Sequence, residues 1–420
     1  MASTPYQRPH LATLRARLEE PPAFMIVVAG PRQVGKTTLV RKALEGHHST
    51  FIATDQPLTR PAADPLRGSS PATGQEPGAR PTGKWLVEQW SNARSATLAL
   101  PPGRHHVLAI DEIQKIPRWS EIVKGLWDED RANGLPLHVV LLGSSPWLML
   151  KGLSESLAGR YETIRLSHWQ YAEMQEAFDV SLDEYIYFGG YPGSARLLSN
   201  EARWRQYVYD SLIMPTINID ILQMRRVDKP ALLKNLFELG CGAYSAQIIS
   251  LTKLQGELQD AGNTVTLSHY LHLLSEAGLL TGLQKYAGQE HRKRASAPKL
   301  NVHNTALISA QATYTFEQAR KDRSYWGRLV ESAVGSHLIN NKPDNANIYY
   351  WRNGPHEVDF VVSHGDTLLA IEVKSGENYR PPKGLQAFAE TFRNARTVVI
   401  GNGGIALADF LLQPVENLLN

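Results

Sequence analysis

The segment Val27–Val40, VVAGPRQVGKTTLV, decides how this chain is expected to fold. It starts within an apolar run, Phe24–Ala29, that predicts a buried strand, and a helix is predicted to begin at Thr37. The loop between them, Gly30–Lys36, fits the pattern G-x-x-x-x-G-K-[ST]. Its glycines let the backbone turn tightly, so that successive N–H groups face phosphate oxygens. The alternative is a chance Gly-Lys-Thr in an ordinary strand–turn–helix.

This loop is expected to hold a nucleoside triphosphate. The helix that follows presents its positive dipole end to the phosphates. Lys36 is expected to reach the β- and γ-phosphates, and the hydroxyl of Thr37 is expected to hold Mg²⁺. The predicted cofactors are therefore ATP and Mg²⁺. The predicted nucleotide-binding residues are Gly30, Pro31, Arg32, Gln33, Val34, Gly35, Lys36, Thr37 and Thr38.

The composition limits what the rest of the chain can be. The 420 residues allow two or three domains, and 44 basic against 41 acidic residues give a net charge of +3, which does not by itself indicate a nucleic-acid partner. The lone Cys241 excludes an intramolecular disulfide and fits a reducing compartment. The start, MASTPYQRPH, lacks the apolar core of a signal peptide. No run of about 18 apolar residues follows, so we expect a cytoplasmic protein without a membrane span.

A second apolar strand, His106–Asp111, ends in two carboxylates. Asp111 is expected to hold Mg²⁺ through water, because an acid at the end of such a strand is the usual partner of a phosphate-binding loop. Glu112 is expected to orient and deprotonate the attacking water. The alternative is that both acids merely cap the helix predicted over Ile113–Trp127.

Two further positions are candidates for the same chemistry. The apolar strand Leu137–Leu142 leads into two serines, and Ser144 or Ser145 would sense the γ-phosphate or position the water. Either serine would serve equally well as a helix N-cap. Arg160 is a candidate arginine finger for the γ-phosphate of a neighbouring subunit, which predicts an oligomer. Alternatively, Arg160 satisfies carbonyls at a helix end marked by Gly159.

Four motifs follow one another along the chain: GPRQVGKTTL (30–39), DEIQKIPRWSEIVKGLWD (111–128), LLGSS (141–145) and SLAGR (156–160). In this order they resemble the prokaryotic AAA+ ATPases whose C-terminal half is domain of unknown function 4143. The resemblance covers about residues 8–390 and implies ATP binding and hydrolysis, followed by a winged-helix segment and a nuclease-like domain. The stretch 56–84, with six prolines and four glycines, departs from the family's usually shorter loop and predicts a flexible insertion.

Two other segments predict packing and no chemistry. Residues 8–20 suggest an amphipathic helix with leucines on one side, beside the nucleotide pocket. Farther along, three tyrosines surround a Gly-Gly-Tyr-Pro-Gly turn that is similar to a short connector of the family. We interpret this connector as a packing and hinge element, carried by Tyr185, Tyr187 and Tyr191.

The region Pro230–Tyr286 predicts a winged helix, because a glycine-containing turn at 262–263 separates two short helices. Helices are expected over 230–240, over 250–259 and from Thr264. The strand Leu279–Tyr286 would form the wing, and its tip HRKRASAPK (291–299) concentrates four cations suited to phosphate contacts. Winged helices also serve as ATPase lids or as docks for proteins, so DNA contact is one of two interpretations.

The last third contains a second constellation. The segment HEVDFVVSHGDTLLAIEVKS (356–375) alternates as two strands around Gly365-Asp366, a pair suited to a hairpin turn. If those two residues form the loop, Asp359 lies directly opposite Glu372, with Lys374 on the same face. Opposed carboxylates repel each other, and a divalent cation between them removes the repulsion.

Together with Glu331 on a preceding predicted helix, this D…E-x-K arrangement resembles the PD-(D/E)xK nuclease fold. The resemblance implies that the acids hold Mg²⁺ and that the lysine assists phosphodiester hydrolysis. The alternative is a surface hairpin whose charged groups form ion pairs on a solvated face. Such a fold is also often kept after catalysis is lost, so the fold does not decide the activity.

The predicted fold class is α/β, with a P-loop AAA+ ATPase domain over 1–200, a helical winged-helix domain over 201–295 and a mixed α/β nuclease-like domain over 296–420. The expected function is Mg²⁺-dependent ATP hydrolysis coupled to DNA binding or processing by a homo-oligomer. The alternatives are an ATP-dependent switch with an inert nuclease fold, which binds DNA or a protein, and a protein-remodelling machine without nucleic acid. Expected catalytic residues are Glu112, Arg160, Ser144 and Lys374. Expected metal ligands are Thr37, Asp111, Glu331, Asp359 and Glu372.

Overall fold

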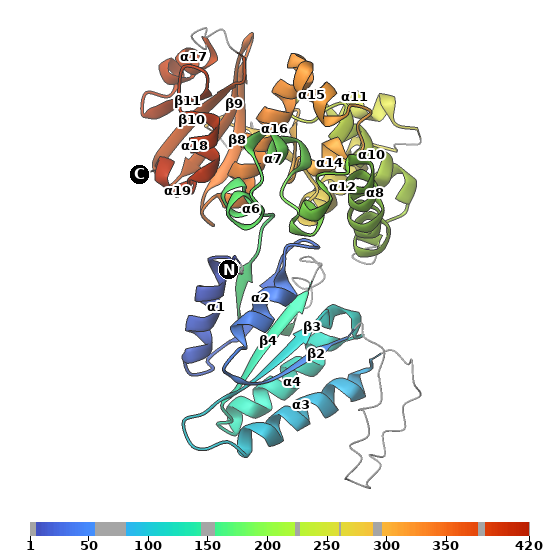
Figure 1. Cartoon of the computed structure of the whole chain (residues 1–420), viewed down its shortest axis with the longest axis vertical. Coiled ribbons are helices and arrows are strands. Elements are labelled where there is room, and N and C mark those ends of the chain that lie inside the picture. Colours follow the sequence, from blue (N-terminus) through green and yellow to red (C-terminus); the bar gives the residue numbers. More distant parts are fainter. Residues whose placement is uncertain are drawn as a thin grey trace. The chain divides into compact units, whose positions relative to one another are not determined.

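The computed structural model describes residues 6–54, 81–143, 156–222, 227–259, 262–288, 296–376 and 383–419. It divides into two compact units, which we call the first unit (Gln7–Leu166) and the second unit (Ser167–Asn420 together with Met1–Tyr6). Figure 1 shows their elements. No helix in the described part of the chain combines the length and the hydropathy that a membrane crossing requires.

The first unit is a parallel sheet with helices on both faces. Its strands lie in the order β2-β3-β4-β1-β5, and every neighbouring pair is parallel. The elements are α1 (His10–Glu19), β1 (Met25–Ala29), α2 (Lys36–Ala43), β2 (His48–Ala53), α3 (Gly83–Leu98), β3 (His106–Asp111), the 3-10 turn η1 (Ile113–Lys115), α4 (Trp119–Ala132), β4 (Leu137–Gly143) and β5 (Tyr161–Arg165).

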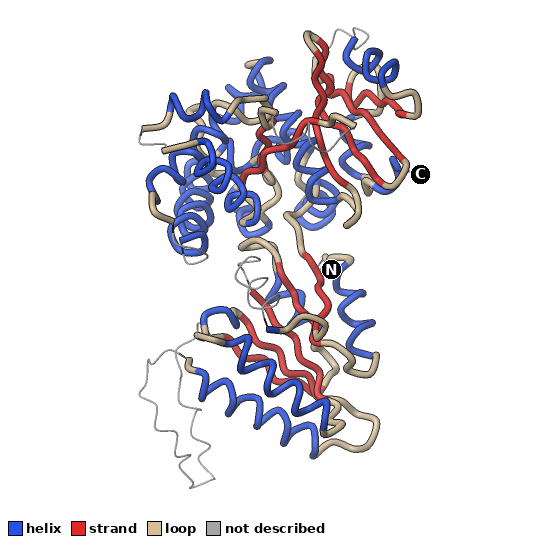
Figure 2. The backbone as a smooth tube through the Cα atoms, turned by 180° about the vertical axis from the view of Figure 1, so that it is seen from behind, coloured by secondary structure: helices blue, strands red, loops and turns tan. Residues whose placement is uncertain are grey.

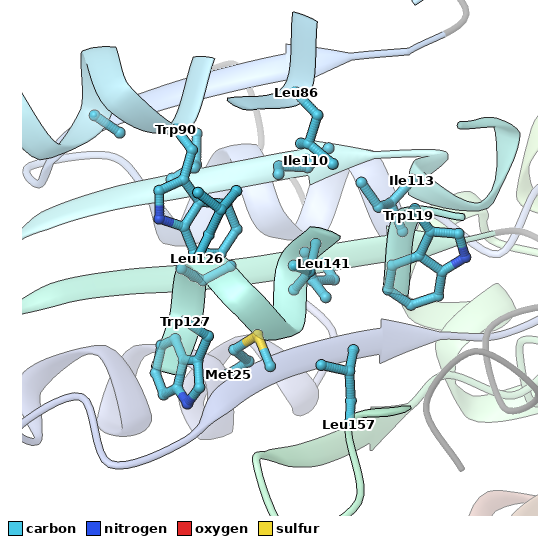
Figure 3. Packing of buried hydrophobic residues seen from close by; sticks show 14 of the residues in the cluster. Met25, Leu86, Trp90, Ile110, Ile113, Trp119, Leu126, Trp127, Leu141 and Leu157 are labelled. Atoms are coloured by element: carbon cyan, nitrogen blue, oxygen red, sulfur yellow. The ribbon is translucent and has the colours of Figure 1, made fainter. Parts of the chain in front are cut away.

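The central strands of this unit read as continuous apolar runs because both of their faces are covered. Alternate residues enter two separate cores. Val27 packs with α3 and α4, whereas Val28 packs with α1 and α2. Figure 3 shows the first of these cores, in which Trp90 of α3 and Trp127 of α4 pack with Met25 of β1. Burial on both faces therefore holds the carboxyl ends of the strands at one rigid edge.

The α/β fold class predicted from the sequence is confirmed in this unit. The strand predicted from Phe24 begins one residue later, since Phe24 is exposed, and the helix after the loop begins at Lys36. The helix expected over residues 8–20 is α1, whose buried leucines contact α2. The insertion predicted over 56–84 falls largely outside the described residues, and α3 begins at Gly83.

The second unit combines a helical region with a six-stranded sheet, drawn in red in Figure 2. The helical elements before the sheet are α6 (Tyr171–Phe178), α7 (Leu182–Phe188), η2 (Pro192–Leu197), α8 (Glu201–Tyr207), the π-helical turns η3 (Val208–Ile213) and η4 (Thr216–Ile221), α10 (Pro230–Gly242), α11 (Leu251–Glu257) and α12 (Thr264–Glu276). The remaining elements are β6 (Leu280–Lys285), β7 (Lys299–Val302), α14 (Ala306–Ser309), α15 (Phe316–Lys321), α16 (Arg323–Asn341), β8 (Asn347–Asn353), β9 (His356–His364), β10 (Thr367–Lys374), α17 (Lys383–Thr391), β11 (Ala395–Gly401), α18 (Leu407–Leu412) and α19 (Glu416–Leu419).

The sheet of the second unit joins the predicted wing to the predicted nuclease-like domain. Its strand order is β11-β10-β9-β8-β6-β7. Strand β6 pairs antiparallel with β7 and parallel with β8. The expected division between residues 295 and 296 thus falls between two strands of one sheet, because backbone hydrogen bonds continue across it. The other expected division, after residue 200, lies beyond Leu166, where the first unit ends.

The connector of tyrosines and glycines packs as expected. Tyr185, Tyr187 and Tyr191 are all buried. A Cβ added at Gly190 would lie 2.0 Å from the carbonyl oxygen of Trp169, so only glycine lets these two backbones approach. The hinge role of this segment stays a prediction.

Candidate functional site

The loop after β1 has the backbone of a phosphate cradle. Gly35, the residue before α2, has φ +91°, and Gln33 has φ +61°. Both lie in the left-handed region, which turns successive N–H groups toward the inside of the loop. A Cβ at Gly30 would lie 2.2 Å from the carbonyl oxygen of Leu166, so Gly30 is required where the chain leaves β5. The local sequence therefore builds a concave loop of backbone donors at the start of a helix.

Lys36 lies across this loop. Its ammonium donates to the carbonyl oxygen of Gly30 at 2.9 Å and to that of Pro31 at 2.7 Å. Lys36 is buried, and α2 positions it because it is the first residue of that helix. A cation held on the inner side of the loop is placed to neutralise phosphate oxygens.

The two predicted Mg²⁺ ligands of the first unit lie in contact. The Thr37 hydroxyl donates to Asp111 Oδ2 at 2.7 Å, although 74 positions separate the two residues in the chain. Asp111 is buried at the carboxyl end of β3, and Thr37 lies in the first turn of α2. A hydroxyl and a carboxylate at this spacing are oxygen ligands of the kind that Mg²⁺ takes. The residues present therefore fit a magnesium ion.

Glu112 follows Asp111 in a strained conformation. Its φ of 55° is uncommon for a residue with a side chain, and such outliers gather at functional sites. The Thr54 hydroxyl donates to the Glu112 carbonyl oxygen at 2.7 Å, and the Thr54 amide donates to that of Asp111 at 3.1 Å. The Glu112 carboxylate accepts from the Gln114 side chain and makes no capping hydrogen bond to η1. Capping, the alternative role for this acid, has no hydrogen bond to support it.

Two residues of this region were not anticipated from the sequence. Thr54, directly after β2, fixes the Asp111–Glu112 turn through two hydrogen bonds. Arg8 is buried, and its guanidinium donates to the carbonyl oxygen of Val34 in the loop at 3.3 Å. Both act through backbone carbonyls, which no side-chain motif reveals. A polar residue at the end of a strand next to β3 was the only available signal for Thr54. We call Gly30–Thr38 together with Asp111 and Glu112 the P-loop site.

Arg160 lies at the opposite end of the sheet. Its carbonyl oxygen accepts from the Met25 amide at 2.9 Å, at the start of β1. The five residues of β1 put the P-loop of the same chain about 15 Å away. The guanidinium donates to both oxygens of Asp128, at 2.7 and 2.9 Å, and to the carbonyl of Ala158 at 3.2 Å. Arg160 would therefore meet a γ-phosphate only on a second copy. Ser144, the other catalytic candidate, lies outside the described residues.

In the second unit, the hairpin has the register that the turn predicted. His364 pairs with Thr367 and Phe360 with Ile371, so Gly365 and Asp366 form the loop. The ladder ends there, one position before Asp359 and Glu372, and Asp359 Oδ2 instead accepts from the Val373 amide at 2.8 Å. The two carboxylates therefore lie where the strands separate. We call Glu331, Glu357, Asp359 and Glu372 the carboxylate cluster.

Lys299 of β7 occupies the centre of this cluster. Its side chain has no exposed surface, and its ammonium lies 2.5 Å from Glu331 Oε1, 3.3 Å from Asp359 Oδ1 and 3.9 Å from Glu357 Oε1. It also donates to the Asp359 carbonyl oxygen at 3.2 Å. The sequence had placed Lys299 at the basic wing tip, and that interpretation is wrong because β7 carries the side chain into the interior of the second unit.

Burial and charge determine how these groups ionise. Burial raises the pKa of Glu331 to about 8, and Asp359 adds to the effect while Lys299 opposes it. Burial and Asp359 likewise raise the pKa of Glu372 to about 7. Burial alone would lower the pKa of Lys299, yet the Asp359 and Glu331 carboxylates raise it above its ordinary value. The ammonium is thus charged and stabilises the carboxylates around it.

Three models of known domains match the chain. Residues 23–175 match the AAA domain, residues 179–318 match the domain of unknown function DUF8612, and residues 326–412 match the domain of unknown function DUF4143. The first match contains the whole P-loop site. The chain thus combines a segment that matches the AAA domain with a C-terminal segment that matches DUF4143. This confirms the AAA and DUF4143 parts of the resemblance, while the nuclease-like character stays a prediction.

Two curated proteins are similar to this chain over almost its whole length. These are the uncharacterized proteins Rv2008c of Mycobacterium tuberculosis and Mb2031c of Mycobacterium bovis. Each is 24% identical over 424 aligned residues, which cover 98% of this chain and 84% of the relative. The similarity runs through both units.

Solved structures similar to this chain include three proteins of low sequence identity. The Walker-type ATPase PABY2304 of Pyrococcus abyssi is 16% identical, with a TM-score of 0.46 over 74% of this chain and 98% of that one. Orc1 of Aeropyrum pernix, solved with DNA, is 14% identical, with a TM-score of 0.28 over 76% and 95%. DnaA of Aquifex aeolicus, solved with AMPPCP, is 12% identical, with a TM-score of 0.31 over 63% and 86%.

The DUF4143 domain, which includes most of α16, presents no metal site comparable to the P-loop site in its described residues. Both oxygens of Asp359 are engaged, one by Lys299 and one by the Val373 amide. Glu331 contacts Lys299, and Glu372 Oε2 is buried without a hydrogen bond. Within the described residues, no group of three or more His, Cys, Asp or Glu side chains is placed to hold a metal ion. The predicted ligand set therefore does not fit a divalent cation in this arrangement.

Lys374, the predicted catalytic lysine of this domain, is more accessible. Its ammonium donates to Glu372 Oε1 at 2.6 Å, and a third of its side chain is exposed. It lines a cavity of about 200 Å³ together with Trp326 and Asn402. Two lysines thus serve one cluster, one buried and one at the edge of a cavity.

The predicted winged helix has its three helices as expected, with α12 following the turn at Gly262 and Asn263. Leu267, Leu271 and Leu274 are buried, whereas Ser268 and His272 are exposed. The Asn263 side chain caps the helix by accepting from the Thr266 amide at 2.9 Å. Residues 289–295, which include most of the basic tip, lie outside the described residues.

Proposed function

We propose that this protein binds and hydrolyses ATP with Mg²⁺ at the P-loop site. The observation that carries the proposal is the contact between Thr37 and Asp111, two residues from distant segments that a magnesium-bound nucleotide requires side by side. The AAA domain match over residues 23–175 supports it, and so does the left-handed backbone at Gln33 and Gly35.

Each residue of the site has a part in this reaction. The amides of the loop and the Lys36 ammonium hold the phosphates, and Thr37 and Asp111 hold Mg²⁺, which draws charge from the phosphate oxygens when it is bound. Glu112 accepts a proton from the attacking water as its oxygen bonds to the γ-phosphorus and the bond to the leaving ADP breaks. Arg160 of a neighbouring copy would stabilise the charge that develops, so that the active form is a homo-oligomer.

Titration with ATP and Mg²⁺ tests this proposal. Calorimetry on the wild type should detect one site per chain, and the Lys36→Ala variant should lose about 10²- to 10³-fold in affinity, because one charged partner of the phosphates is gone. Since Lys36 also contacts Gly30 and Pro31, circular dichroism should first establish that the variant is folded. Heat from a folded variant equal to that of the wild type would overturn the assignment.

We further propose that ATP turnover changes how the second unit engages DNA. The exposed face of α12 after a glycine-containing turn, followed by the basic segment 291–294, supports a DNA-binding role. Filter binding with and without ATP, at several salt concentrations, is the test. We expect the affinity to fall steeply as salt increases and to differ between the two nucleotide states. Affinity independent of salt and nucleotide would favour a protein partner.

A second candidate function is an ATP-dependent switch whose nuclease-like fold is inert. The burial of Lys299 within the carboxylate cluster favours it, because the ammonium already satisfies Glu331 and Asp359. Cleavage of DNA by the wild type and by the Glu372→Ala variant separates the two candidates. Cleavage that only the wild type performs would support DNA processing, and no cleavage by either would support the switch.

A further inference from the structure

The carboxylate cluster brings acidic side chains together from separate elements of the second unit. Glu331 lies on α16, Asp359 on β9 and Glu372 on β10. Carboxylates that are this close and only partly exposed repel one another, and a positive charge among them removes the repulsion. The cluster therefore needs a cation, which is either a metal ion or a side chain of the protein.

The ammonium of Lys299 supplies a positive charge within the cluster. Its side chain is 0% exposed, and three carboxylates lie within 3.9 Å of its ammonium. The Phe360 ring, 4.9 Å away, adds a cation–π contact from the same strand as Asp359. An ammonium has three hydrogens to donate, and the Glu331 side chain, the Asp359 side chain and the Asp359 carbonyl oxygen accept them. Every donor of the cation is therefore used within the cluster.

The remaining oxygens leave little for a second cation. The amide of Val373 takes the other oxygen of Asp359, and Lys374 takes one oxygen of Glu372. Glu372 Oε2 is buried without a hydrogen bond, but no group of three or more acidic, histidine or cysteine side chains among the described residues is placed to surround an ion, and Mg²⁺ seeks octahedral coordination. A divalent ion at the centre would also lie against the positive charge of Lys299.

We propose that the Lys299 ammonium is the resident cation of the carboxylate cluster and takes the place that a divalent metal holds in metal-dependent nucleases. Lys299 then ties β7, the second strand of the wing, to α16 and β9. The cluster is a structural junction between the helical region and the DUF4143 domain, and no metal-dependent cleavage is centred on it. This inference is independent of ATP hydrolysis at the P-loop site.

Metal titration of the full chain is the first test. An Asp111→Asn background removes the magnesium ligand of the P-loop site, so that Mn²⁺ binding measured by electron paramagnetic resonance reports on the rest of the protein. We expect Mn²⁺ binding by the Asp111→Asn protein to be unchanged when Asp359→Asn or Glu372→Gln is added. A Mn²⁺ site that either substitution removes would overturn the proposal.

Stability of the second unit is the second test. The Lys299→Met variant leaves buried carboxylates uncompensated, and its unfolding temperature should fall by roughly 10 °C. The double variant with Asp359→Asn should recover at least half of that loss, because one uncompensated charge is removed. Lys374→Met is the matched control, since Lys374 contacts Glu372 but is partly exposed, and it should lower the temperature by less than a third as much.

If Lys299→Met alone does not fold, a protein with an unaltered carboxylate cluster still tests the proposal. In the nucleotide-free Asp111→Asn background, 10 mM Mg²⁺ should leave the unfolding temperature of the second unit unchanged within 1 °C, whereas a metal bound in the cluster would raise it by mass action. A rise that Glu372→Gln removes, or an equal effect of Lys299→Met and Lys374→Met, would contradict a resident ammonium.

Discussion

The P-loop site and the carboxylate cluster both place acids on a buried strand, but the acids meet different partners. Asp111 accepts a hydrogen bond from the Thr37 hydroxyl, a neutral group that is itself an oxygen ligand. Asp359 lies against the Lys299 ammonium, so its charge is already balanced. The P-loop site pairs its acid with a second oxygen ligand, whereas the carboxylate cluster has a lysine ammonium at its centre. The residue that decides between them comes from a distant part of the chain in both cases.

The two sites also differ in whether all of their charged groups lie close together in one chain. The P-loop site contains a lysine, a hydroxyl and two acids, but its candidate arginine, Arg160, lies at the far end of β1. The carboxylate cluster contains all of its charges within one unit. We therefore expect the first site to respond strongly to nucleotide and to a second copy, and the second to respond mainly to changes in its own charge balance.

The largest expected effect comes from Glu112→Gln. If Glu112 is the general base, turnover of ATP should fall about 10²- to 10⁴-fold, while affinity for ATP changes less than about threefold. The glutamine keeps the shape of the side chain but does not accept a proton from water. A phosphate-release assay and a binding titration on the same preparation separate the two quantities.

Gln114→Ala is the matched control for this variant, because Gln114 donates to the Glu112 carboxylate but is not expected to touch water or phosphate. It should lower turnover far less than Glu112→Gln. Equal losses in the two variants would mean that Glu112 supports the local structure and is not a general base. The proposed chemical difference between the P-loop site and the carboxylate cluster would then be wrong.

The next effect concerns Arg160. Its replacement by alanine should lower hydrolysis about 10- to 100-fold, the value of one or two charged hydrogen bonds to the transition state, with ATP affinity retained. If the arginine acts on a second copy, a mixture of Arg160→Ala and Lys36→Ala chains should regain part of the activity, since each supplies what the other lacks.

Asp128→Asn distinguishes this role from a structural one. It weakens the ion pair with Arg160 but leaves the guanidinium in place. A loss of hydrolysis equal to that of Arg160→Ala would show that the pair itself matters and that the arginine is structural. Unchanged hydrolysis in the Arg160 variant would lead to the same conclusion.

Much of the P-loop site could be predicted from the sequence, because its residues follow a fixed spacing. The loop from Gly30 to Lys36 and the strand ending at Asp111 are local patterns, and parallel strands bring their carboxyl ends to one edge. Thr54 could not be predicted in the same way. It acts through backbone carbonyl oxygens of Asp111 and Glu112, and no residue type is diagnostic of such a contact.

In the carboxylate cluster, the strand pairing could be predicted from the sequence but the central cation could not. The hairpin register was predictable because a two-residue turn dictates which positions pair, and β9 and β10 pair as expected. The position of Lys299 could not be predicted, because the sequence HRKRASAPK groups this lysine with the cations expected at the wing tip. Only the pairing of β7 with β6 shows that this lysine points into the second unit. The contact of Lys299 with acids far away in the sequence cannot be predicted from a local pattern, and it changes the interpretation of the cluster from a metal site to an ion-paired one.

The smallest expected effect is a difference in pH response between the two units. Burial raises the pKa of Glu331 from 4.5 to about 8, so folding favours its protonated form. The stability that this proton contributes is fully present below about pH 4.5 and is lost as the pH rises through 8. In the first unit, burial lowers the pKa of His138 from 6.5 to about 4, so stability there is lost as the pH falls instead.

Hydrogen exchange of β9 and β10 at pH 6, 7 and 8 measures this effect on the second unit, with β3 and β4 as the internal reference for the first. The wild type should lose about 1–2 kcal/mol more opening free energy in β9 and β10 over this range than Glu331→Gln does. Comparing the two proteins cancels Glu372 and the buried histidines, which titrate in both. Equal slopes would mean that Glu331 is ionised throughout, and the charge balance assigned to Lys299 would then have to include a further cation.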